Sequence, residues 1–100
     1  MRIVEIEKRT PILIKQLLKI WESSVRETHL FLSDNEIKRI ADYVPLALNN
    51  INHLVIVEDD NYQPVAFMGI EKERLEMLFV APHEMKKGLG KSLIQFGIKN

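Results

Sequence analysis

Residues 75–98 read LEMLFVAPHEMKKGLGKSLIQFGI, which combines an apolar strand, a turn with two glycines and the start of a helix. A helix that follows a glycine turn leaves backbone N–H groups without partners, and its dipole favours negative charge at that end. The residues of this turn that matter most are Gly88 and Gly90, with Lys86, Lys87 and Lys91 around them. The stretch therefore predicts an anion-binding site, and we expect the anion to be a phosphate.

The composition limits the class of protein. The chain has 100 residues with 14 Lys plus Arg and 14 Asp plus Glu, so a single domain without an excess of basic charge is expected. Balanced charge argues against binding to nucleic acid or to an anionic membrane. There is no cysteine, and the three histidines are scattered, so we expect neither a disulfide nor a metal site. With no signal peptide or long apolar run in the sequence, a cytoplasmic location is predicted.

The first half of the chain predicts a strand and then helices. Residues 1–7 alternate between polar and apolar types, as in a strand. Thr10 is a candidate N-cap with Pro11 at the first helical position, and helical spacing continues to about Thr28. Ser33 and Glu36 form a capping box at the start of a second helix. Pro45 favours an extended Val44, so this helix ends there or restarts as a short segment through Leu48.

The second half predicts three consecutive strands and a final helix. Residues 53–58 and 64–70 are apolar runs joined by turn residues, and residues 74–80 follow after a further turn at 71–73. The last helix starts at Gly88 and continues to Asn100. The order β-α-α-β-β-β-α indicates an α/β fold in which helices cover a sheet.

Three interpretations of the glycine turn were compared. A nucleotide-binding P-loop needs a further glycine where this chain has Met85, and a dinucleotide-binding G-x-G-x-x-G pattern needs one where it has Leu93. The third interpretation is structural, because isolated glycines commonly do no more than turn the chain. The two nucleotide motifs fail at named positions, whereas the structural interpretation stays open.

The segments LFVAP at 78–82 and KKGLGK at 86–91 resemble the acyl-CoA-binding core of the GCN5-related N-acetyltransferase (GNAT) family. WESS at 21–24 and THLFL at 28–32 also resemble one bacterial subgroup of small acetyltransferases. The resemblance spans the whole chain and implies a GNAT-like mixed, mainly antiparallel sheet. It also implies acetyl-CoA as the acetyl donor and a primary amine of unknown identity as the acceptor.

The resemblance assigns the cofactor-binding residues. It places the pyrophosphate of acetyl-CoA on the N–H groups of residues 86–91 and the pantetheine arm along the preceding strand. The residues so assigned are Leu78, Phe79, Val80, Lys86, Lys87, Gly88, Leu89, Gly90 and Lys91. The chain departs from the family in having Met85 where Arg or Gln is common. It also stops before the family's next strand, tyrosine-bearing helix and hairpin, so residues 1–100 are expected to form one truncated domain.

Candidate residues for the chemistry lie on the last strand and near the end of the first helix. Glu76 is the candidate base that removes the proton of the acceptor ammonium. If no bulge intervenes, its side chain lies on the same face of the strand as Leu78. The alternative is that Glu76 is an ordinary exposed strand glutamate. The candidate acceptor pocket consists of Trp21, Thr28, His29 and Phe31. The alternative for these residues is core packing by the aromatic rings and capping by the histidine.

A second functional hypothesis is a module that binds CoA without catalysis and acts as a sensor or regulator. The strand at residues 74–80 would leave an unpaired, apolar sheet edge, which is open to another strand. We therefore expect a possible homodimer through this edge.

Overall fold

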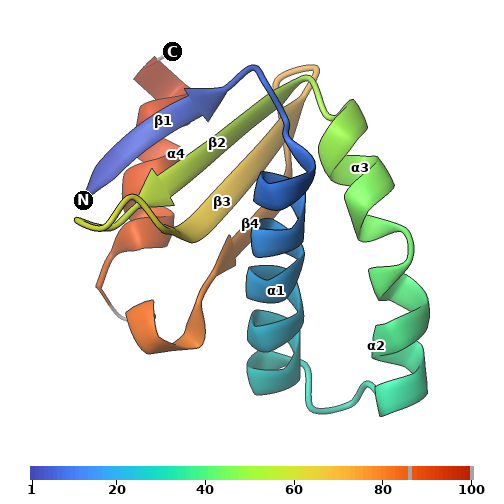
Figure 1. Cartoon of the computed structure of the whole chain (residues 1–100). Coiled ribbons are helices and arrows are strands. Elements are labelled where there is room, and N and C mark those ends of the chain that lie inside the picture. The colour runs from blue at the N-terminus through green and yellow to red at the C-terminus, as the bar shows by residue number, and fades with distance from the viewer. Residues whose placement is uncertain (86, 100) are drawn as a thin grey trace.

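The computed structural model describes residues 1–85 and 87–99, whose four strands form an antiparallel sheet with helices on both of its faces (Figure 1). The strand order is β1-β2-β3-β4, so every strand pairs with its neighbour in the sequence. The elements are β1 (Arg2–Ile6), α1 (Pro11–Thr28), α2 (Asp34–Ala41), α3 (Val44–Asn50), β2 (His53–Glu58), β3 (Pro64–Glu71), β4 (Arg74–Val80), the 3-10 helix η1 (Pro82–Glu84) and α4 (Leu89–Lys99). The predicted α/β class and the mainly antiparallel sheet are confirmed.

Both faces of the sheet are covered. The helices α1, α2 and α3 lie on one face and α4 lies on the other (Figure 1). Leu54, Ile56 and Phe67 belong to the core beneath α1, whereas Val55 and Met68 belong to the core beneath α4. The central strands β2 and β3 are therefore buried on both sides, which explains their continuous apolar sequences.

The helix starts follow the caps read from the sequence. The Thr10 hydroxyl accepts a hydrogen bond from the amide of Leu13 at 3.2 Å, and α1 ends at Thr28 as predicted. At the start of α2, Ser33 Oγ accepts from the amide of Glu36 at 3.1 Å, and Glu36 Oε1 accepts from the amide of Ser33 at 3.0 Å. The predicted capping box is therefore confirmed.

The segment around Pro45 corrects one prediction. The second helix ends at Ala41 and a new helix begins at Val44, so the predicted restart is right and the extended Val44 is wrong. Pro45 lies in the first turn of α3, where its missing amide costs no helical hydrogen bond. The helix also runs past Leu48 to Asn50.

A β-bulge changes the expected position of Glu76. Gly69 pairs with Met77, but the next residue of β3, Ile70, pairs with Leu75, so Glu76 has no partner on β3. The expected placement of Glu76 on the face of Leu78 required that no bulge intervene, and this condition is not met. The bulge lies beside a position that requires glycine, because a Cβ on Gly69 would be 2.7 Å from Cγ of Met77.

Replacement of Gly69 by alanine should lower the free energy of unfolding by about 1–3 kcal/mol, because the added methyl group overpacks the site between Met77 and Ile51. Urea unfolding followed by the fluorescence of Trp21 measures the change. Gly90→Ala is the matched control, since its Cβ would meet only Leu78 Cδ2 at an ordinary 3.6 Å. Equal losses in the two variants would contradict the steric explanation.

Candidate functional site

The candidate site lies at the end of the sheet where β4 leads through η1 into α4. The C-terminal end of α1 lies at this same end of the molecule (Figure 1). Among the described strands, β4 pairs only with β3, so its other edge is open. In an antiparallel strand the N–H and C=O groups of alternate residues point away from the partner, and on β4 they point to this open edge. Leu78, Phe79 and Val80 lie on this part of β4.

The loop between β4 and α4 is anchored at its start and open at its end. The amide of Ala81 donates to the carbonyl of Val65 at 2.8 Å, which ties the loop to β3. Gly88 has φ +76°, and a Cβ there would meet nothing within 4 Å. The helix begins at Leu89, one residue later than predicted. Gly88 thus supplies a left-handed turn that an L side chain rarely adopts, at a place open to solvent.

The first turn of α4 follows Gly88 directly. The amide of Ser92 makes the first bond of the helix, to the carbonyl of Gly88 at 3.0 Å. The amides of Leu89, Gly90 and Lys91 precede it, in the first turn, where a helix supplies no acceptor. Amides in a first helical turn and the helix dipole favour an anion, and the anion site expected from the sequence stays a prediction.

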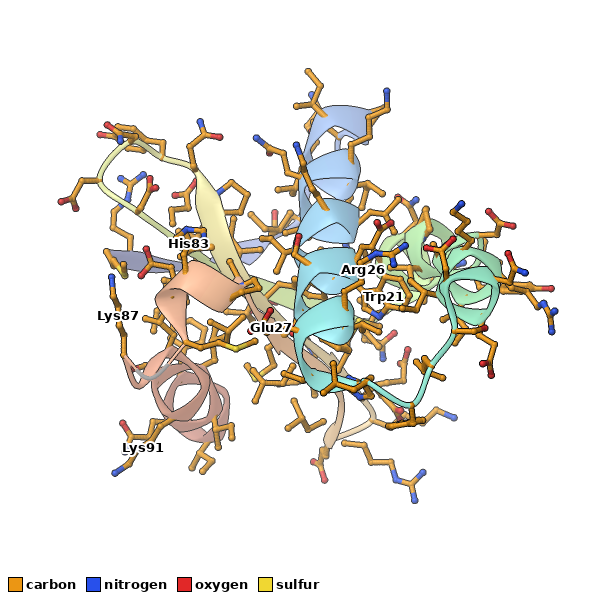
Figure 2. The ribbon with its side chains drawn as sticks, turned by 90° about the horizontal axis from the view of Figure 1, so that it is seen from below. Trp21, Arg26, Glu27, His83, Lys87 and Lys91 are labelled. Atoms are coloured by element: carbon orange, nitrogen blue, oxygen red, sulfur yellow. The ribbon has the colours of Figure 1, made fainter. Side chains whose placement is uncertain are left out.

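The two lysines of the loop that the structure describes have different contacts. Lys86 lies outside the described residues. The side chains of Lys87 and Lys91 point in opposite directions (Figure 2). Lys87 Nζ lies 2.8 Å from Oε2 of Glu84, whereas Lys91 is exposed and makes no ion pair with a described residue. Of the two described lysines, only Lys91 presents an uncompensated charge.

Glu84 is a site residue that the sequence analysis missed. It is only 9% exposed although it lies in a short surface helix. Lys87 approaches its Oε2 outside hydrogen-bonding geometry, so the contact is an ion pair. His83 Nε2 lies 3.7 Å from Oε1, a contact that is ionic only when the imidazole is protonated. In the sequence, the three-residue spacing from Glu84 to Lys87 is the feature that could have indicated this ion pair.

Two candidate carboxylates make no ion pair with a described residue. Glu76 is exposed at the bulge of β4. Glu27, which the sequence analysis did not consider, is exposed in the last turn of α1 and points toward the side of η1 (Figure 2). Either group is accessible to a bound amine.

The structure brings together three of the four residues predicted for the acceptor pocket. The Thr28 hydroxyl donates to the carbonyl of Ser24 at 2.8 Å and lies 2.8 Å from Nδ1 of His29. The rings of His29 and Phe31 are 5.7 Å apart, and Phe31 is 80% exposed. Trp21 is separate from them, because it is buried in the core on the side of α1 that faces α2 (Figure 2). For Trp21 the core-packing alternative is therefore the better description.

An ion-pair network holds the two ends of the α1–α2 loop together. Arg26 lies 3.1 Å from Glu22 and 2.8 Å from Asp34, and Lys38 lies 3.0 Å from the other oxygen of Asp34. Hydrogen bonds from Lys38 and then from Arg26 hold the pKa of Asp34 below its usual value of 3.8. The same network raises the pKa of Arg26. Charge pairing thus connects the helix end that carries His29 to the start of α2.

A cavity of about 480 Å³ lies elsewhere, between the C-terminal half of α4 and the sheet. Its lining includes Glu5, His53, Met68, Leu75 and Gly97. It contains none of the residues predicted to bind the cofactor or the acceptor.

Within residues 1–85 and 87–99, no three His, Cys, Asp or Glu side chains are grouped to hold a metal. In the same residues, no helix is both long and apolar enough to cross a membrane.

Comparison with known proteins finds acetyltransferases. The chain is 32% identical over 88 residues to the peptidyl-lysine N-acetyltransferase YjaB of Salmonella typhimurium, and the match covers 84% of this chain and 57% of the relative. The chain thus spans little more than half the length of this curated relative. No family model matches the chain.

Solved structures share the fold of the chain. The apo form of YjaB from Escherichia coli superposes with a TM-score of 0.83 at 28% identity, over 99% of this chain and 66% of that one. A GNAT family acetyltransferase from Brucella melitensis, in complex with acetyl-CoA, superposes with a TM-score of 0.67 at 18% identity, over 98% of this chain and 67% of that one.

The acid sensitivity of the protein should depend on Asp34. Because the folded-state pKa of Asp34 is depressed, its ion pairs stabilise the protein above the unfolded-state pKa, and this stabilisation is lost as the pH falls through the folded-state value. The melting temperature should therefore fall more steeply between about pH 5 and about pH 2 in the wild type than in Asp34→Asn. Asp42→Asn is the control, since Asp42 makes no ion pair with a described residue. Parallel curves for the wild type and Asp34→Asn would contradict this role.

Proposed function

Given that the chain has the fold of the GNAT family, we propose that the protein transfers an acetyl group from acetyl-CoA to a primary amine. The observation that carries the proposal is the adjacency of an open strand edge on β4 and an open helix start on α4. A diphosphate joined to an extended, amide-containing arm is the ligand that fits both features. The acetyl-CoA complex with the same fold supports this assignment.

The phosphate end of the cofactor would bind at the start of α4. The amides of Leu89, Gly90 and Lys91 would donate to the phosphate oxygens, and the helix dipole would add about 0.3–1 kcal/mol per charge. The exposed Lys91 would supply further, salt-screened attraction.

The arm of the cofactor would run along the open edge of β4. Backbone groups of Leu78, Phe79 and Val80 would hydrogen-bond to its amides, as an added strand would do. The side chains of Leu78 and Phe79 pack against opposite faces of the sheet, so the backbone at the edge is fixed before the cofactor arrives. A fixed backbone reduces the ordering cost of binding.

Acetyl-CoA supplies an activated thioester, and the protein's own task is to present a neutral amine to it. An amine is protonated at neutral pH, so a base or a water chain must remove one proton before attack. Glu76 at the bulge is our first candidate for this role, and Glu27 at the end of α1 is the second.

For the acceptor we propose the side-chain amine of a protein lysine. The name of the Salmonella relative, a peptidyl-lysine N-acetyltransferase, supports this choice. Thr28, His29 and the exposed ring of Phe31 would contact the acceptor, and an aromatic face can attract an ammonium group before its proton is removed. Catalysis is favoured over a purely CoA-sensing module because the relatives are named as enzymes. The cytoplasmic location stays a prediction, and so does the homodimer through the open edge of β4, which would compete with the cofactor arm for the same backbone groups.

Replacement of Gly88 by valine should raise the dissociation constant for CoA at least about tenfold, because a β-branched residue resists the left-handed turn and displaces the amides that follow. Isothermal titration of the full-length protein with CoA measures this. Gly90→Ala is the matched control. Its Cβ points to Leu78 rather than into the open loop, so its affinity should stay within about twofold of wild type. Unchanged affinity in Gly88→Val would remove the loop from the binding site.

Glu76→Gln should lower kcat/KM for an amine acceptor at neutral pH and recover part of it at high pH, where more of the amine is already neutral. The measurement is the pH dependence of kcat/KM of the full-length enzyme. Glu27→Gln serves as the comparison, since both carboxylates are exposed and neither pairs with a described residue. A wild-type profile in Glu76→Gln, with the loss appearing in Glu27→Gln, would transfer the role of base to Glu27.

A further inference from the structure

The contact between Glu84 and Lys87 joins the two ends of the short segment that precedes Gly88. Glu84 closes η1 and is 9% exposed, whereas the side chain of Lys87 is 56% exposed. The 2.8 Å contact between Lys87 Nζ and Glu84 Oε2 therefore fastens an otherwise exposed part of the loop to a buried group. Gly88 and the first turn of α4 follow directly.

The burial of Glu84 decides how the ammonium of Lys87 is used. A buried carboxylate is costly without a positive partner, and removing the partner of such a pair is strongly unfavourable. If a phosphate bound the ammonium group of Lys87, the carboxylate of Glu84 would lose its ion pair and stay buried next to a second anion. His83 is 3.7 Å from Oε1, and its side chain is 72% exposed, so it is a weaker substitute. The ammonium group of Lys87 is thus paired with Glu84 and is not available to a ligand.

Lys91 provides the contrast within the same loop. Its side chain points away from Lys87, is exposed, and makes no ion pair with a described residue (Figure 2). A phosphate can attract Lys91 without breaking an interaction of the folded protein. The two lysines therefore differ in their contacts, although each stands next to a glycine of the same loop.

We propose that Lys87 is a positioning residue that acts through Glu84, and that its ammonium group does not bind the phosphates of the cofactor. The ion pair holds Lys87, which precedes Gly88 and the first turn of α4, against η1, so that the amides of Leu89, Gly90 and Lys91 are in place before the diphosphate binds. A loop ordered in advance lowers the entropy cost of binding. This role rests on the proposed binding of acetyl-CoA at the start of α4.

A double-mutant cycle tests the proposal by titration of CoA into the full-length protein. Lys87→Met leaves the Glu84 carboxylate buried and unpaired, so the dissociation constant should rise about tenfold. Adding Glu84→Gln removes that charge and returns the net charge of the pair to zero. The double variant should therefore bind CoA within about threefold of the wild type. Lys91→Met is the matched control, and it should weaken binding and reduce its dependence on salt.

The outcomes separate the two proposals. If the double variant binds as weakly as Lys87→Met and shows the reduced salt dependence of Lys91→Met, Lys87 contacts phosphate and the positioning role is overturned. If the wild type does not bind CoA, the proposed function fails and this role fails with it. Circular dichroism and thermal unfolding verify that each variant folds. Should Lys87→Met not fold, the double variant decides alone, because it contains no unpaired charge and is compared directly with the wild type.

Discussion

Backbone hydrogen-bonding groups that have no partner among residues 1–85 and 87–99 are the feature on which the rest of this structure depends. The outer edge of β4 and the first turn of α4 both present such groups, and both lie at the same end of the sheet. Two details bring them together. The bond from Ala81 to Val65 fixes the point where the chain leaves the sheet, and the left-handed Gly88 turns it into the helix. An extended ligand with an anionic end can satisfy both sets of groups at once, which a compact ligand cannot.

The packing of the sheet keeps this end rigid. With α1–α3 on one face and α4 on the other, β2 and β3 are buried on both sides, and β4 is held against them by side chains from both cores. The bulge at Glu76 belongs to the same packing, because the side chain of Met77 lies against Gly69, which has no Cβ, on the neighbouring strand β3. The comparison structures share this framework over nearly the whole chain.

Local features could be predicted from the sequence because they depend on neighbouring residues. The caps at Thr10 and Ser33, the consecutive strands and the glycine turn are of this kind. The bulge could not be predicted, since it is a register shift between β3 and β4 and depends on how the two strands pair. The split of α2 from α3 was left open because proline permits either an end or a new first turn. The roles of Trp21 and Lys87 were also hidden, because burial and the contact with Glu84 exist only in the folded chain.

The central claim is that the amides at the start of α4 receive the diphosphate of CoA. A titration of the ¹⁵N-labelled full-length protein with CoA, followed by amide chemical shifts, tests it most directly. The account predicts that the amide signals of Gly88, Leu89, Gly90 and Lys91 shift most, together with those of β4. Shifts confined to other parts of the molecule, or no shifts at saturating CoA, would contradict it.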